Sequence, residues 1–194
     1  MARTKAFDPQ VALQSALELF WSKGYEATSM ADLVDHLGIG RASIYATFGN
    51  KRALYLKALD RYGEARNTAL ARELSRPGPA LPAVRAAVRR LAAEAAEEPG
   101  RTRGCLVTNT AAELAPHDGA AARRVELNWA HLETLLHSAL LRAQAQGELP
   151  EERDPRALAR MLLVLLQGLG VVGKASTDPA RVLDAAEQAL TLLD

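Results

Sequence analysis

The sequence has one cysteine, few aromatic residues and almost no net charge. A single thiol, Cys105, cannot form a disulfide within the chain, which fits a reducing compartment. A formal net charge of +1 gives no sign of a nucleic-acid partner, so such a partner must be argued from where the charges lie. The first residues, MARTKAFDPQ, lack the apolar stretch of a signal peptide. We therefore expect a cytoplasmic protein.

Long apolar runs and enzyme motifs are absent as well. The longest apolar run, Met161 to Val172, is interrupted by Gln167 and is too short to cross a bilayer, so no membrane partner is expected. There is no glycine-rich phosphate loop, and no Ser or Cys stands at a recognisable spacing from a His. Glu133 and His137 form an i, i+4 pair without a third metal ligand. We predict no catalytic residue, no metal and no cofactor.

The residues that are present favour helices throughout. Ala, Leu, Glu and Arg recur everywhere, and no stretch alternates apolar and polar residues as a strand would. Apolar residues recur at i, i+3, i+4 and i+7, which predicts an all-α fold of about nine helices. These are expected over roughly 9–23, 29–37, 41–47, 51–74, 82–97, 103–114, 118–146, 154–174 and 178–193. We predict two domains, 1–52 and 53–194.

Residues 30–49 have the pattern of a helix-turn-helix, with two short amphipathic helices joined by a turn that contains glycine. Gly38 suits the positive φ of that turn. Ile44 and Phe48 lie on the inner face of the second helix, which leaves small and polar side chains outside. An arginine at its start, Arg41, can reach a guanine edge in the major groove. Side chains that can donate hydrogen bonds to phosphates are Thr28, Ser29, Tyr45, Thr47 and Lys51.

Several short motifs in this region occur together and in register. They are Gly24-Tyr25, Thr28-Ser29, Leu37-Gly38-Ile39, Arg41-Ala42-Ser43-Ile44-Tyr45, Phe48 and Asn50-Lys51-Arg52-Ala53-Leu54. With them, residues 8–60 resemble the N-terminal domain of TetR-type transcriptional repressors. The resemblance implies an all-α homodimer whose N-terminal domain binds a palindromic DNA operator. It also implies a C-terminal domain that binds a small-molecule effector, which releases the DNA.

By position, the resemblance assigns individual DNA contacts. Base contacts fall on Arg41, Ala42 and Ser43, and phosphate contacts fall on Ser29, Tyr45, Thr47 and Lys51. Two positions depart from the family pattern. Gly40 stands where the family usually has a capping Ser, so the recognition helix begins less firmly. Ala46-Thr47 replaces a common aromatic-His pair, so one phosphate contact is expected to be weaker or different.

The helix over 154–174 is apolar on two sides, and such a helix needs two partners. One partner is its own domain, and the other would be a second subunit that also contacts the helix over 178–193. The alternative is that both helices simply belong to the core. The predicted dimer contacts are Leu163, Val164, Gly170, Val182, Ala186, Ala189 and Leu193.

An effector pocket is expected among the helices that follow residue 82, because ligand sites are mostly apolar with a few aimed polar groups. The candidate lining residues are Cys105, Asn109, Glu113, Trp129, Leu132, Met161 and Leu165. An ordinary structural role explains each of them equally well. The simplest coupling hypothesis is that the effector shifts the helix over 103–114, which pushes the connecting helix over 51–74.

Three classes of function stay open at this point. The first is a homodimeric repressor released by a small-molecule effector. The second is a DNA-binding regulator without such an effector, controlled by its abundance, by a protein partner or by oxidation of Cys105. The third, and weakest, is a helical interaction module that does not bind DNA.

Overall fold

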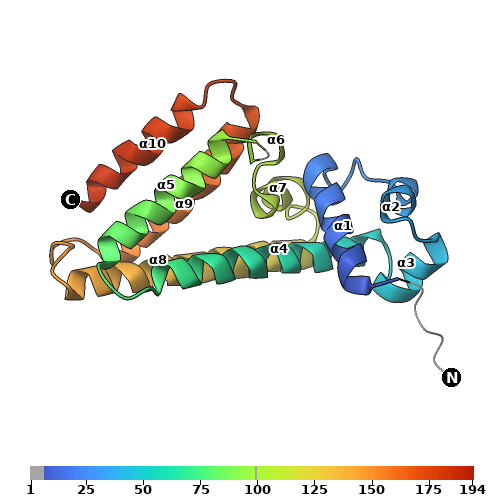
Figure 1. Cartoon of the computed structure of the whole chain (residues 1–194), viewed down its shortest axis with the longest axis horizontal. Coiled ribbons are helices and arrows are strands. Elements are labelled where there is room, and N and C mark those ends of the chain that lie inside the picture. Colours follow the sequence, from blue (N-terminus) through green and yellow to red (C-terminus); the bar gives the residue numbers. More distant parts are fainter. Residues whose placement is uncertain (1–6, 99) are drawn as a thin grey trace. The chain divides into compact units, whose positions relative to one another are not determined.

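The computed structural model describes residues 7–98 and 100–194 and contains only helices within those ranges (Figure 1). The all-α prediction is confirmed. The helices are α1 (Pro9–Lys23), α2 (Met30–Leu37), α3 (Arg41–Phe48), α4 (Lys51–Leu74), α5 (Ala80–Ala96), α6 (Gly100–Arg103), α7 (Leu106–Glu113), α8 (Gly119–Ala145), α9 (Pro155–Ala175) and α10 (Ala180–Leu190), followed by the short 3-10 helix η1 (Thr191–Leu193).

The chain divides into two compact units. The first ends at Gly63 and the second begins at Glu64, so α4 contributes its first half to one unit and its second half to the other. The functional boundary predicted after residue 52 stays a prediction, since the compact units are defined by packing alone.

The helices of the first unit begin where the sequence supplies caps. The carboxylate of Asp8 accepts a hydrogen bond from the backbone N–H of Gln10 at 2.7 Å, and Pro9 occupies the first helical position of α1. Ser29 and Asp32 form a reciprocal capping box at the start of α2. Gly38 ends α2 in the left-handed conformation, with φ of 65°.

An apolar and aromatic core joins the four helices of the first unit. Phe20 from α1, Leu33 from α2, Ile44 from α3 and Leu54 from α4 are fully buried. The ring of Tyr55 lies edge-on to that of Phe20, with centroids 5.0 Å apart, an arrangement that aromatic pairs prefer. This core fixes which face of α3 is left outside.

The second unit has its core between α5, α8, α9 and α10, with the last turns of α4 added to it. Figure 1 shows α5, α9 and α10 side by side. Gly173 of α9 lets the backbone of α5 approach closely, because a Cβ there would lie 2.3 Å from the carbonyl oxygen of Ala95. Fully buried leucines such as Leu140 and Leu162 fill the space between the helices.

The helix predicted over 103–114 is present as α7, but it begins at Leu106 because the chain is interrupted at Gly104. That residue has φ of 64°, and a Cβ there would meet the backbone oxygen of Gly170 at 3.1 Å. Both the conformation and the close approach require glycine. The short helix α6 ends at Arg103, just before this break, and was not predicted as a separate helix.

Within the described ranges, α9 is the one helix that is long and apolar enough to cross a membrane by length and composition. It extends beyond the apolar run noted in the sequence, to 21 residues, but one such helix is weak evidence for a membrane span. Only 28% of its most apolar window is buried within the chain. Three valines of this helix, Val164, Val171 and Val172, are exposed in the single chain.

Candidate nucleic-acid interface and sensor unit

The recognition helix α3 is held by its inner face. Ile44 and Phe48 are buried, with 0% and 6% of their surface exposed. The side chains of Arg41, Ala42, Ser43 and Tyr45 are exposed on the other side. The helix therefore presents one arginine and small or hydroxyl-bearing side chains to solvent, and small residues permit close approach to a DNA groove.

Arg41 is positioned by Tyr45, one turn further along α3. Its guanidinium carbon lies 5.7 Å from the centroid of the Tyr45 ring, and its Nη2 lies 3.4 Å from the phenol oxygen. Arginine carries five N–H donors in a planar fork, so most of them are left to bind a base edge or a phosphate. The ring restricts the side chain before any ligand arrives.

Two predicted phosphate donors, Thr28 and Lys51, are used inside the first unit. The Thr28 side chain is fully buried, and its hydroxyl donates to the carbonyl of Gly24 at 2.6 Å. The Lys51 ammonium donates to the carbonyls of Tyr25 and Thr28 at 2.9 Å each. A fully buried hydroxyl that is already donating does not reach a phosphate, so we remove Thr28 from the proposed contacts. Lys51 keeps a third N–H and remains a prediction.

Ser29 is exposed but shares its hydroxyl with Asp32. Both the backbone N–H and the hydroxyl of Ser29 donate to one Asp32 oxygen, each at 2.7 Å. Lys23 lies 2.7 Å from the same carboxylate. The hydrogen bond from Lys23, and then those from Ser29, hold the pKa of Asp32 well below its usual range. A phosphate at Ser29 would therefore lie beside a carboxylate that Lys23 already neutralises, and the Ser29 hydroxyl would have to leave Asp32 to reach it.

The beginning of α4 adds cations that the sequence argument did not single out. Asn50 caps the helix by accepting a hydrogen bond from the backbone N–H of Ala53 at 2.8 Å. Arg52 and Lys57 are exposed in the first two turns, and the Lys57 ammonium lies 6.0 Å from the Phe48 ring centroid. The sequence already places Arg52 and Lys57 close to Lys51, but only Lys51 was predicted to contact a phosphate.

Comparison with known proteins decides the family. Residues 12–58 match the model described as "Bacterial regulatory proteins, tetR family". Residues 80–190 match "Tetracyclin repressor-like, C-terminal domain". The chain belongs to the TetR family. Members of this family are DNA-binding transcriptional regulators and not enzymes, as the sequence predicts.

Relatives of this TetR-family chain match it over nearly its whole length. The HTH-type transcriptional regulator YezE of Bacillus subtilis is 40% identical, and the match covers 100% of both chains. The HTH-type transcriptional repressor ComR of Escherichia coli is 31% identical, over 98% of this chain and 90% of its own. A solved structure of a cysteine-substituted CifR regulator with 26-base-pair double-strand operator DNA has a TM-score of 0.86 at 30% identity, and covers 100% of both chains.

The second unit of this TetR-family chain, Glu64–Asp194, is called the sensor unit here after the role that its family resemblance predicts. Three of its helices meet at Gln167. Its side-chain oxygen accepts hydrogen bonds from the hydroxyl of Thr108 on α7, at 2.7 Å, and from the indole N–H of Trp129 on α8, at 3.1 Å. Trp129 was predicted to line a pocket, and it borders two hollows. One is about 560 Å³ and mostly apolar, and the other is about 270 Å³ and includes Glu133 and His137.

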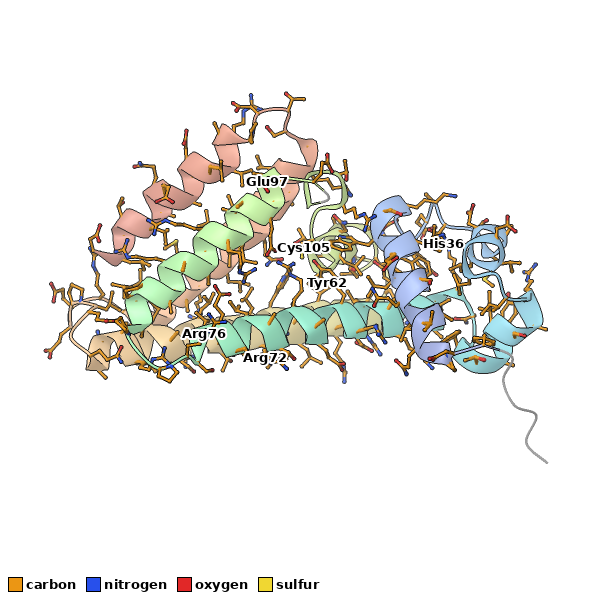
Figure 2. The ribbon with its side chains drawn as sticks, viewed as in Figure 1. His36, Tyr62, Arg72, Arg76, Glu97 and Cys105 are labelled. Atoms are coloured by element: carbon orange, nitrogen blue, oxygen red, sulfur yellow. The ribbon has the colours of Figure 1, made fainter. Side chains whose placement is uncertain are left out.

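The other predicted pocket residues are spread over several places. Asn109 donates to the carbonyl of Arg103 at 2.9 Å, and its oxygen lies 3.5 Å from the Lys174 ammonium. Cys105 is half-buried at the start of α7 (Figure 2). Glu113 is half-buried near the end of α7. Three half-buried side chains pack against the core, namely Leu132, Met161 and Leu165. The part of the chain that the structure describes contains no metal-binding group of three His, Cys, Asp or Glu side chains.

Replacing Gln167 by leucine is expected to destabilise the sensor unit. The substitution removes the acceptor shared by Thr108 and Trp129, and a donor left without a partner in the interior costs free energy. Because Trp129 is only half-buried, we expect a loss of about 1–2 kcal/mol in the free energy of unfolding, measured with urea. Gln167→Glu keeps an acceptor and is the matched control. A leucine variant as stable as the native chain would show that water replaces the lost bonds.

Proposed function

We propose that this TetR-family regulator is a cytoplasmic homodimeric repressor, which binds a palindromic operator and is released from it by a small-molecule effector. The observation that supports operator binding is the exposed face of α3, where Arg41 lies against Tyr45 while Ile44 of the same helix is fully buried. The name of ComR as a repressor and the operator complex of CifR support the same role. No membrane, metal or cofactor is needed for it.

Base contacts are proposed for the exposed first turn of α3, at Arg41, Ala42 and Ser43. A guanidinium that forms two hydrogen bonds with one guanine would set most of the sequence preference. Phosphate contacts are proposed at the exposed and half-buried donors around it, which are Ser29, Tyr45, Thr47 and Lys51, with Arg52 and Lys57 added.

The proposed subunit interface is the exposed apolar face of α9 and α10. Val164 and Val171 are two turns apart on α9 and have 70% and 56% of their surface exposed. Exposed apolar side chains that cluster on one face mark an interaction surface. The face consists of Val164, Val171, Val172, Leu183 and Leu192, with the half-buried Leu163 and Ala189 at its margin.

Four of the predicted dimer contacts are buried within their own subunit, and they are withdrawn. Val182, Ala186 and Leu193 are at most 1% exposed, because the apolar stripe of α10 packs into the core of its own subunit. Gly170 is buried too, and a Cβ there would lie 3.4 Å from the Cβ of Cys105. Residues buried within one subunit cannot form the contact between two.

The effector is proposed to act on α7, α8 and α9 where they are joined by the hydrogen bonds to the Gln167 side chain. A ligand that competes for this group would separate helices that are otherwise tied together. The hollows bordered by Trp129 are the proposed routes of approach.

Oxidation of Cys105 is the second candidate control, and one observation favours it. The CifR structures with operator DNA were solved as cysteine-substituted variants. Cys105 lies at the break before α7, and its Cβ would be 3.4 Å from a Cβ added at Gly170 of α9, so a bulky group on this residue would lie close to both helices. Diamide with glutathione supplies both the oxidant and the second thiol, and leaves a glutathione mixed disulfide on Cys105. If this treatment abolishes operator binding of the native chain, but not of Cys105→Ser, control by oxidation is favoured over an effector; control by abundance or by a protein partner would leave both proteins unaffected.

The DNA-binding proposal is tested with Arg41→Ala on duplexes selected from a random library. We expect the variant to lose about 1–3 kcal/mol of discrimination between the selected duplex and one with the guanine replaced, measured by gel shift at fixed salt. Arg76→Ala, an exposed cation of the other unit, is the control and should bind as the native chain does. Unchanged discrimination by Arg41→Ala would remove the base-contact assignment, and a native chain that selects no duplex would refute DNA binding itself.

A further inference from the structure

Four charged side chains of alternating sign link the second half of α4 to α5. Arg66 of α4 pairs with Glu94 of α5 at 3.1 Å, and Glu94 pairs in turn with Arg90, one turn away on α5. Arg90 also reaches back to Glu73 of α4, through its Nη2 at 2.6 Å and its Nε at 3.1 Å. We call this set, Arg66, Glu94, Arg90 and Glu73, the charge ladder.

The order of charges in the ladder allows one alignment of the two helices. Arg66 and Glu73 lie two turns apart on α4, while Arg90 and Glu94 lie one turn apart on α5. If α4 slid along α5 by about one turn, roughly 5.4 Å, in one direction, Arg66 would face Arg90. The same slide in the other direction would bring Glu73 against Glu94. Like charges meet either way, and only the observed register pairs all four.

Stability alone does not explain such a ladder. Ion pairs between partly exposed side chains contribute little net stability, and the ladder side chains are 23–43% exposed. The apolar anchors of α4 in this unit, Leu70 and Leu74, are buried already. Pairing of opposite charges at fixed spacing favours one register in addition to this apolar packing, so the ladder adds specificity of register.

We propose that the charge ladder locks α4 to α5, so that the two helices move together and α5 transmits the state of the sensor unit to the DNA-binding unit. The proposal rests on the ligand-controlled DNA binding proposed above. It differs from the route through residues 103–114 that the sequence favoured. Because α4 is continuous from Lys51 to Leu74 and supplies buried residues to both units, a displacement imposed on its second half is carried into the first.

The lock is tested by measuring the spread of distances between α4 and α5. Spin labels are placed at cysteines that replace the exposed Arg72 and Ala86, in the Cys105→Ser background, and labelled chains are diluted with unlabelled ones. Dipolar spectroscopy should give one narrow distribution for the intact ladder. Arg90→Glu should broaden or shift it, and Arg90→Gln should do so less.

Two matched variants separate register from general damage. Arg89→Glu breaks the two-bond pair with Glu187 on α10 but leaves the ladder intact, so its α4–α5 distances should equal those of the native chain. Inversion of all four ladder charges restores every opposite-sign pair, and should restore the narrow distribution. Unchanged distances in both Arg90 variants would overturn the lock, as would a four-charge inversion that stays as broad as Arg90→Glu.

Operator affinity tests the second half of the proposal on the library-selected duplex. We expect Arg90→Glu to bind roughly 10-fold more weakly, within the range typical of coupling between sites, and the four-charge inversion to bind as the native chain does. Broadened distances with unchanged operator affinity would overturn transmission through α5. If the native chain binds no duplex, the proposed function is refuted. The distance measurement still tests whether the charge ladder locks α4 to α5.

Discussion

Val164→Glu is expected to convert the proposed dimer into a monomer and to weaken operator binding by at least about 100-fold, because two linked half-sites bind far more tightly than either alone. Val164 has 70% of its surface exposed in the single chain and is the most exposed of the apolar residues on α9. A carboxylate there is harmless to the isolated subunit. In a dimer it would be buried without a cation, which proteins tolerate poorly.

The measurement is sedimentation equilibrium of the full chain, followed by gel shift on the selected duplex. Val11→Glu is the control for oligomeric state, since Val11 is similarly exposed at 63% but lies on α1 of the first unit. It should leave the mass of the assembly unchanged. If Val164→Glu remained a dimer, the interface would have to lie on another face of the sensor unit.

Helix positions were predictable where capping is local in sequence. Asp118 accepts hydrogen bonds from the backbone N–H groups two and three residues later in α8, and Asp154 does the same in α9. Each cap involves atoms two or three residues away, so the sequence contains all of the information. The break at Gly104 could not be foreseen, because its cause is the backbone of Gly170, 66 residues away along the chain.

The sequence predicted which side chains near the helix-turn-helix can donate hydrogen bonds, but not which groups accept them. A Thr and a Lys near a helix-turn-helix fit phosphate contacts in general, but here the Thr28 hydroxyl and the Lys51 ammonium bind carbonyl groups of the loop between α1 and α2. Which donor is already used depends on how the first turn of α4 meets that loop, which is a tertiary contact. Arg41 was easier, since its one described hydrogen bond is to Tyr45 in the same helix.

The subunit interface shows the same limit for apolar residues. On α10 the sequence has one clear apolar stripe, through Val182, Ala186 and Leu190, and that stripe was assigned in part to the dimer. An amphipathic pattern says that a face is buried, but not by which chain. On α9 apolar residues lie on two sides of the helix, so one side remains exposed after the other has packed into the core. Val164, predicted as a dimer contact, is on the exposed side.

Gly173→Ala is expected to destabilise the sensor unit by about 3 kcal/mol, although alanine favours helices more than glycine does. The added Cβ would lie 2.3 Å from the carbonyl oxygen of Ala95 and 3.0 Å from its carbonyl carbon. Both atoms belong to the backbone of α5, so no side chain can rotate away. The helices must separate instead, and the buried contacts between α5 and α9 are lost with them.

Gly168→Ala, five residues earlier in α9, makes the same chemical change in open space, with no heavy atom within 4 Å of the added Cβ. It should raise the free energy of unfolding by about 0.5–1 kcal/mol, because glycine loses more backbone entropy on folding. Gly168 is exposed on the side of Val164, so both substitutions are compared in the Val164→Glu background by urea unfolding. Opposite signs would show that close approach of α5 and α9, and not helix propensity, requires Gly173. Equal stabilisation by the two alanines would mean that the helices part without cost and that the approach seen at Ala95 does not hold the sensor together.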